Sequence, residues 1–289
     1  MPDSPMDAPE WFTTALAANV ETGSVTVGGA QIKYRAWGEA GSPGVVLVHG
    51  GAAQSHWWDH IAPLLAAGRR VVAPDLSGHG DSDHREHYDL EQWCLEALTV
   101  AVAAGIDGPP VLVGHSMGGM VAFVAAHLYG DRLAGVQIID SPIWARFHKE
   151  SADRAKTAFG PKKLYPTQDD AVARFRLVPG QDHTLPYVMD HIARTSLVEG
   201  DGGWAWKFDP KMIGRDGTAL LGAGAPSCRM AYFRAECGII PDDAYAELRS
   251  RLGESTLFTT LPTAGHHPMI DQPLPLVTAI RTTLAAWGL

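Results

Sequence analysis

The chain has few cysteines and no apolar run long enough to cross a membrane. Cys94, Cys228 and Cys237 are the only cysteines in 289 residues, and no two of them have the spacing of a zinc site. This excludes a disulfide scaffold and predicts a reducing compartment. The first twelve residues have neither a basic segment nor an apolar run, unlike a secretory signal. These absences predict a cytoplasmic protein that does not enter a membrane.

Basic residues are also in the minority. Lys and Arg number 23, whereas Asp and Glu number 32, which gives a formal net charge of −9. Without a basic excess there is no electrostatic reason to expect nucleic acid as a partner. Hydrophobic residues make up 46% of the chain and charged residues 19%, a composition that excludes a disordered chain. The length fits one large domain or a domain with a sizeable insertion.

Short apolar runs alternate with longer amphipathic segments along most of the chain. The runs are continuous and rich in β-branched residues, which is typical of parallel strands covered by helices on both faces. Gly28-Gly29 predicts a hairpin between the first two runs, and Asp89 is a candidate helix cap. Strands are predicted at 24–27, 31–37, 45–48, 70–73, 111–113, 136–139, 230–233 and 257–261. Helices are predicted at 56–67, 90–104, 117–129 and 274–287.

The strand pattern stops in the middle of the chain. Residues 143–206 contain helical pieces, several Pro and Gly residues and no strong strand. This segment is therefore interpreted as a mostly helical cap over the carboxyl ends of the strands. The predicted organisation is a core formed by 1–142 and 209–289, with a helical cap at 143–208.

One motif carries a recognisable chemistry. Gly114-His115-Ser116-Met117-Gly118 has the form G-x-S-x-G, with an apolar strand before it and an apolar helix after it. A serine at such a sharp turn projects its hydroxyl from the sheet, and the close backbone contacts leave room only for small residues two positions away. The following helix presents free N–H groups to a developing negative charge. Ser116 is the candidate nucleophile.

Four segments, in this order, show that the chain resembles the α/β-hydrolase superfamily along nearly its whole length. They are His49-Gly50-Gly51, the stretch 74–82 (PDLSGHGDS), the stretch 114–119 and Gly265-His266. The resemblance implies an α/β-hydrolase fold, with a mostly parallel twisted sheet, flanking helices and a cap. It also implies a catalytic triad in the chain order nucleophile, acid, base. It says much less about the substrate.

The resemblance places the catalytic base at His266. This residue follows the last predicted strand, so that its imidazole can lie over the serine and accept the hydroxyl proton. His267 is the adjacent competitor, and a pocket-lining role is preferred for it. His115, next to the nucleophile, is also expected to line the pocket rather than to act as a base.

The acid is where the sequence departs from the family pattern. The usual Asp position, after the strand at 230–233, holds Gly238. Asp140, which ends the strand at 136–139, is the favoured acid, because some relatives, including haloalkane dehalogenases, carry theirs at that strand end. Glu236, at the edge of the vacant position, is the rival acid.

Backbone groups are expected to form the oxyanion hole. The N–H of Met117, directly after the nucleophile, is one candidate donor, and the resemblance gives Gly51 as the second. Trp57 and Trp144 follow catalytic loops and are the favoured aromatic residues of the pocket. Such a pocket predicts an apolar or aromatic small-molecule substrate.

The leading hypothesis is a serine hydrolase that cleaves a carboxylic ester or lactone through an acyl-enzyme, with no metal or organic cofactor. The nearest alternative is a C–C bond hydrolase of ring-cleavage products, which would act on a vinylogous diketone. The same fold also serves non-hydrolytic lyases, cofactor-free dioxygenases and receptors. A serine nucleophile argues against dehalogenase or epoxide hydrolase chemistry, which would use an aspartate.

Overall fold

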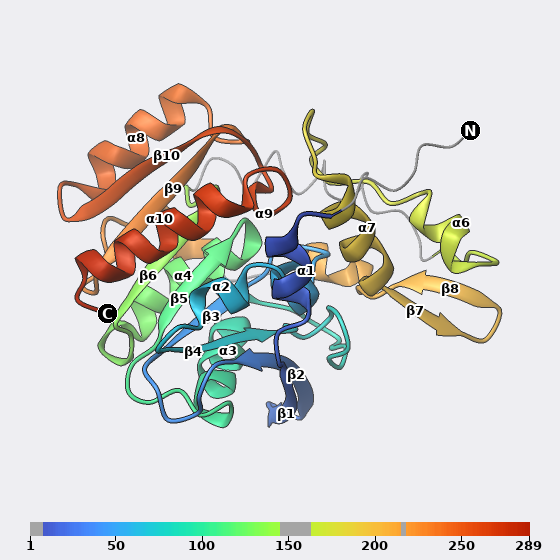
Figure 1. Ribbon diagram of the computed structural model, residues 1–289. Helices are drawn as coiled ribbons and strands as arrows, with labels where there is room; N and C mark the ends of the chain where they lie inside the picture. Colours follow the sequence, from blue (N-terminus) through green and yellow to red (C-terminus); the bar gives the residue numbers. More distant parts are fainter. Residues whose placement is uncertain (1–7, 145–162, 215–217) are drawn as a thin grey trace.

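Figure 1 shows the computed structural model, in which residues 8–144, 163–214 and 218–289 are described. An eight-stranded sheet crosses the molecule, and helices cover both of its faces. The strands are β1 (Glu21–Val27), β2 (Ala30–Trp37), β3 (Gly44–Val48), β4 (Arg70–Pro74), β5 (Val111–His115), β6 (Gly135–Ile139), β9 (Met230–Cys237) and β10 (Thr256–Gly265).

The strand order in the sheet is β1-β2-β4-β3-β5-β6-β9-β10. The hairpin β1–β2 turns at Gly28-Gly29, whose φ angles of +53° and +81° suit glycine. β2 also pairs antiparallel with β4, whereas every pair from β4 to β10 is parallel. The carboxyl ends of the parallel strands therefore meet at one edge of the sheet, where ligands bind in open α/β sheets.

Alternate residues of the central strands enter two separate cores. Val46 and Val48 of β3 pack on the face covered by α3 (Leu90–Ala103) and α4 (Met117–Leu128). Val45 and Leu47 pack on the face covered by α2 (Ala62–Leu65) and α10 (Pro273–Ala286). All four are buried, because helices cover both faces.

The helices are α1 (Glu10–Leu16), α2 (Ala62–Leu65), α3 (Leu90–Ala103), α4 (Met117–Leu128), α8 (Asp242–Leu252), α9 (Pro268–Asp271) and α10 (Pro273–Ala286). Short 3₁₀ helices are η1 (Ser55–Trp58), η2 (Gly130–Arg132), η3 (Pro210–Gly214) and η4 (Thr218–Gly222).

The predicted parallel α/β architecture is confirmed, and each predicted strand lies within a strand of the sheet. Asp89 caps α3, because its carboxylate accepts a hydrogen bond from the Gln92 N–H at 2.7 Å. The prediction of one helix over 56–67 is wrong. That segment contains only η1 and the four-residue α2, which starts at Ala62 with Pro63 at its second position. Pro63 lacks an N–H and so cannot continue a helix from the preceding turn.

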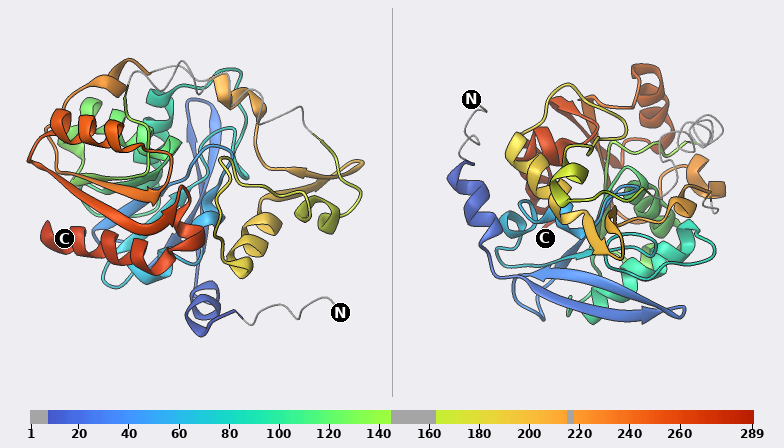
Figure 2. Two further views of the ribbon diagram at one scale, coloured as in Figure 1. Left: turned by 90° about the horizontal axis from the view of Figure 1, so that it is seen from above. Right: turned by 90° about the vertical axis from the view of Figure 1, so that its right-hand side faces the viewer.

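The inserted segment differs in part from the expected helical cap. It contains α6 (Gln168–Val172), α7 (Pro186–Thr195) and an antiparallel hairpin of β7 (Leu197–Gly200) and β8 (Gly203–Trp206). The expectation of no strong strand is therefore wrong for 197–206, where Gly202 supplies the positive φ that the hairpin turn requires. Residues 145–162 of the predicted cap lie outside the described residues. Figures 1 and 2 show α6, α7 and the β7–β8 hairpin beyond one end of the sheet, away from α8.

Among the described residues, no helix is long and apolar enough to cross a membrane.

Candidate active site

Ser116 lies at a strained turn between β5 and α4. Its φ of +52° is unusual for a residue with a side chain. A Cβ on Gly114 would lie 2.1 Å from the Gly118 carbonyl oxygen, and a Cβ on Gly118 would lie 2.3 Å from the Val48 oxygen. Both neighbours are backbone atoms that cannot rotate away. The two glycines of the motif are therefore required for the close packing of strand, turn and helix.

A chain of hydrogen bonds joins three residues that are distant in the sequence. His266 Nε2 lies 3.0 Å from Ser116 Oγ, and His266 Nδ1 lies 2.8 Å from Asp140 Oδ2. The three residues stand at the ends of β5, β6 and β10. When Nδ1–H donates to the carboxylate, Nε2 is the lone-pair nitrogen and can accept the serine proton.

The Asp140 carboxylate is fully buried but well satisfied. Oδ1 accepts a hydrogen bond from the Ala235 N–H at 3.1 Å, and Oδ2 accepts one from the Ile239 N–H at 3.0 Å as well as that from His266. Hydrogen bonds to the charged form stabilise an ionised carboxylate. A Cβ on Gly238 would lie 2.2 Å from Oδ2. The Asp140 carboxylate thus occupies the space that a side chain at the usual acid position would need.

The rival acid, Glu236, lies in a different environment. It is exposed, and its carboxylate accepts a hydrogen bond from the Thr263 N–H at 2.7 Å. Of the two carboxylates that sequence reasoning left open, the structure brings Asp140 to His266.

The two candidate oxyanion donors lie next to the serine. The position of a Gly50 Cβ is 3.5 Å from the Ser116 Cβ, and that of a Gly51 Cβ is 3.9 Å from the Met117 Sδ. Met117 is the first residue of α4, so its N–H has no partner within the helix. In the described part of the chain, neither the Gly51 nor the Met117 N–H donates a hydrogen bond. Both donors are available to a ligand.

Two further histidines, His115 and His267, have rings in contact with that of His266. His115 Nε2–H donates to the His266 carbonyl oxygen at 2.7 Å. The backbone N–H and Nδ1 of His267 lie 2.9 and 3.0 Å from Gln181 Oε1. Burial, with the adjacent His266, holds the pKa of both His115 and His267 well below the usual histidine value, so that both are neutral near pH 7. Sequence reasoning missed Gln181, because nothing local marks a residue that reaches the site from the insertion.

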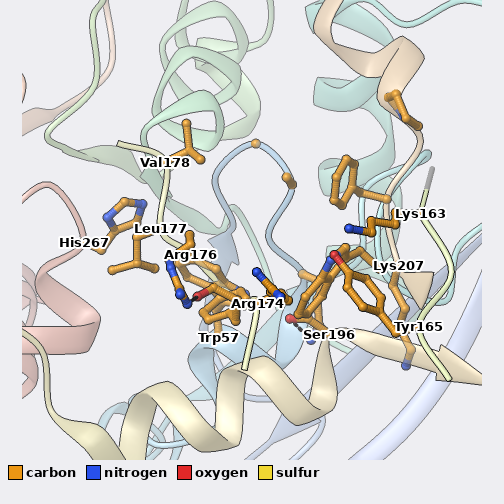
Figure 3. Close-up of a pocket in the computed structure, with 17 residues that line it drawn as sticks. Trp57, Lys163, Tyr165, Arg174, Arg176, Leu177, Val178, Ser196, Lys207 and His267 are labelled. Atoms are coloured by element: carbon orange, nitrogen blue, oxygen red, sulfur yellow. Dashed lines mark hydrogen bonds between the residues drawn. The ribbon is translucent and has the colours of Figure 1, made fainter. Parts of the chain in front are cut away.

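A cavity of about 590 Å³ lies between the sheet edge and the insertion (Figure 3). Ser116 is not among the described residues that line it. The wall includes Gly51, whose Cβ position is 3.9 Å from Met117 Sδ, and His267, the neighbour of His266. The volume is within the range of small-molecule sites. Aromatic side chains line much of the rest, namely Trp57, Tyr165, Phe175, Trp206 and Phe208.

Two residues expected in the pocket lie elsewhere. His115 is buried, with its ring centroid 4.9 Å from that of His266, and is not among the described residues that line the cavity. Trp144 is likewise absent from the described lining, and it packs half-buried against the core on the α3–α4 face. Trp57 and His267 are lining residues. Adjacency to a catalytic residue in the sequence is a weak guide here, because consecutive residues of a turn face different directions.

The lining of the cavity is not aromatic alone. Four basic side chains also line the cavity: Lys163, Arg174, Arg176 and Lys207. All four belong to the segment 163–208, whose placement over the sheet edge is a tertiary feature that no local pattern reveals.

Within the described residues, one group has the composition of a metal site. Asp59 Oδ2 accepts hydrogen bonds from His56 Nδ1 at 2.7 Å and His191 Nε2 at 3.0 Å, and Arg35 Nε donates to Oδ1 at 2.9 Å. Burial alone would raise the pKa of Asp59, but the two imidazoles and Arg35 hold it below its usual value. The carboxylate is satisfied without an ion, and the group includes no member of the Ser116 site.

Comparisons with known proteins agree with this fold. A family model described as the alpha/beta hydrolase fold matches residues 43–184. Esterase Rv0045c of Mycobacterium tuberculosis is 26% identical over 86% of this chain and 84% of that protein. Lipase LipV of the same organism is 28% identical over 86% of this chain and 95% of that protein. The solved structure of E-2-(acetamidomethylene)succinate hydrolase is 20% identical and aligns with a TM-score of 0.77 over 92% of this chain and 100% of that chain. This is a likeness of fold.

The chain belongs to the α/β-hydrolase superfamily, as the sequence motifs indicated. It is a hydrolase, and the esterase and lipase among its relatives support ester hydrolysis at the level of the family. The predicted fold class is confirmed.

Proposed function

We propose that the protein is a serine hydrolase that cleaves a carboxylic ester or lactone. The observation that carries this proposal is the continuous hydrogen-bond chain from Asp140 through His266 to Ser116, beside a cavity of small-molecule size. Asp140 orients the imidazole and stabilises its charged form, His266 moves the proton, and Ser116 is the nucleophile.

In the acylation step, Ser116 Oγ attacks the ester carbonyl while His266 Nε2 takes the hydroxyl proton. The carbonyl oxygen becomes an oxyanion, and the free N–H groups of Gly51 and Met117 donate to it. Each such donor contributes about 3 kcal/mol in comparable enzymes. The intermediate collapses to an acyl-serine, and His266 returns the proton to the departing alcohol oxygen.

Deacylation repeats these steps with water. His266 takes a proton from a water molecule, whose oxygen attacks the acyl carbonyl and forms a second oxyanion in the same hole. Collapse releases the carboxylic acid, and the proton returns to Ser116 Oγ. No step requires a metal or an organic cofactor.

The segment 163–208 is proposed to act as a cap that supplies most of the cavity wall. Gln181 joins it to the catalytic loop, because its Oε1 accepts both hydrogen bonds from His267. A cap of this kind excludes water from the acyl-enzyme except where the cavity opens.

The proposal is tested with a fluorophosphonate probe, followed by intact mass and peptide mapping. A single adduct on Ser116 is expected in the wild type and in Ser250→Ala, an exposed serine of α8 used as the matched control. Ser116→Ala should give no adduct. An unlabelled wild type would contradict an activated serine. Labelling of Ser116 with turnover of a vinylogous diketone but not of esters would instead support the C–C hydrolase.

A further inference from the structure

The cavity has the opposite charge balance to the chain. The whole sequence has nine more acidic than basic residues. The described residues that line the cavity include four basic side chains and no Asp or Glu. A concave site lined by charges of one sign concentrates ligands of the opposite sign. This reversal of charge is therefore a property of the site and not of the composition.

Three of the four cations are available to a ligand. Lys207 Nζ lies 2.9 Å from Asp81 Oδ1 and is already paired. Lys163, Arg174 and Arg176 form no ion pair with any carboxylate of the described residues. Arg176 Nη1 donates to backbone carbonyls, which leaves its positive charge without a carboxylate partner in the described part of the chain. Arginine is well suited to bind a carboxylate or phosphate, because its planar fork can donate two parallel hydrogen bonds.

In Figure 3 the basic side chains of the cavity lie apart from His267. His267, which adjoins the catalytic histidine, lies at one side of the pocket in Figure 3, and Lys163, Tyr165 and Lys207 lie at the other. Arg174 and Arg176 lie between them in this view. A ligand with its ester at Ser116 and its body against the aromatic side chains would extend its far end into this basic region.

From this arrangement we infer that the cavity takes an ester with a carboxylate or phosphate group remote from the scissile carbonyl. Arg174 and Arg176 bind that anionic group, and Lys163 adds positive potential. The aromatic wall holds the apolar part between the two ends. The inference rests on the proposed function for the position of the scissile bond, and it changes the substrate class from apolar to amphipathic and anionic.

The test compares matched esters that differ only in charge. On the acyl side these are the phenyl monoester of adipic acid and the phenyl ester of adipamic acid, and on the alcohol side the butyrate esters of 6-hydroxyhexanoate and 6-hydroxyhexanamide. The wild type should favour the charged member of at least one pair by about 10-fold in kcat/KM at low ionic strength. The preference should fall at high ionic strength. A phosphate-terminated ester then shows which of the two anions is preferred.

The double variant Arg174→Gln/Arg176→Gln should reduce this preference to about twofold or less. Arg281→Gln, an exposed arginine of α10, removes one charge outside the cavity and should leave the preference unchanged. Equal kcat/KM for charged and neutral esters in both pairs, or a preference that survives in the double variant, would overturn the anionic subsite while leaving ester hydrolysis intact.

If none of the four esters is hydrolysed, the result counts against the proposed function and leaves the subsite to be measured by binding. Calorimetric titration of Ser116→Ala with the same four esters then decides the subsite directly. Ser116→Ala should bind a charged ester more tightly than its neutral counterpart, and the difference should disappear when Arg174→Gln and Arg176→Gln are combined with Ser116→Ala. This result supports the anionic subsite even if no ester is cleaved. Equal affinity for charged and neutral esters would overturn it.

Discussion

The acid of the proposed triad depends on a pair of positions, 140 and 238. The Asp140 carboxylate lies where a side chain on residue 238 would have to stand, since a Cβ there would be 2.2 Å from Oδ2. Asp140 has a φ of +42°, which a glycine would adopt without strain. The backbone at residue 238 is outside the left-handed region, so it accepts a side chain once the Asp140 carboxylate is removed. Residue 140 can therefore hold this carboxylate only because residue 238 is glycine.

Asp140→Asn should lower kcat by about 10⁴-fold, the loss that the same change causes in a serine-protease triad, because the amide holds the imidazole in the wrong tautomer. Glu236→Gln should change kcat less than about twofold, since Glu236 is exposed and bonded to Thr263. In Asp140→Gly, the second change Gly238→Asp should recover at least about tenfold of the lost activity. A large loss in Glu236→Gln with full activity in Asp140→Asn would instead identify Glu236 as the acid.

At the scale of elements, the site depends on how closely α4 packs against β3. A Cβ on Gly118 would lie 2.3 Å from the Val48 oxygen and 2.5 Å from the His49 oxygen. α4 begins with Met117, and the turn after β3 carries Gly51. The two proposed oxyanion donors thus belong to the two elements that meet at Gly118, and their separation is set by this contact.

Gly118→Ala should lower kcat by about 100-fold, because forcing α4 away from β3 moves the donors relative to each other. It should also reduce the free energy of unfolding by about 1–3 kcal/mol, the usual cost of overpacking. Ester turnover and urea denaturation measure the two effects. Gly200→Ala is the matched control, because a Cβ at Gly200 meets nothing within 4 Å. Unchanged kcat in Gly118→Ala would show that the contact does not set the oxyanion hole.

The elements differ in how far the sequence predicts them. The buried strands of the sheet were predicted because each is a continuous apolar run, such as Val45 to Val48, whose pattern is set by burial on both faces. The hairpin β7–β8 was missed because its strands have four residues each with little alternation; β7 is largely exposed and β8 is mostly half-buried. The prediction of one helix over 56–67 was wrong because it followed the apolar pattern and gave too little weight to Pro63, which interrupts a helix.

The candidate site was predictable where it lies on the sheet edge. Ser116 and His266 follow strands in motifs that the sequence displays, and the structure brings them together. The choice between Asp140 and Glu236 needed the register of three strands, which no local pattern gives. The basic side chains of the cavity and Gln181 come from the insertion, and their approach to the site is decided by tertiary packing alone.

At the scale of the whole molecule, buried histidines couple folding to pH. Burial lowers the pKa of His60 to about 4, and its Nε2–H donates to the Met269 carbonyl at 2.6 Å, joining the segment before α2 to α9. Burial also lowers the pKa of His115 and His267. In the unfolded chain these side chains return to the ordinary histidine pKa of about 6.5 and take up protons there. Acid therefore favours the unfolded state.

Above about pH 6.5, His60 is neutral in both states and does not lower the free energy of unfolding. As the pH falls from about 6.5 towards about 4, protonation of His60 in the unfolded chain lowers the free energy of unfolding by about 3 kcal/mol in total. In urea denaturation, His60→Gln should show a smaller loss of unfolding free energy than the wild type between about pH 7 and about pH 4.5. The glutamine amide can still donate to the Met269 carbonyl, so the hydrogen bond is kept while the titrating group is removed. His87→Gln, at an exposed position, should follow the wild type. Parallel curves for His60→Gln and the wild type would show that His60 does not carry this pH dependence.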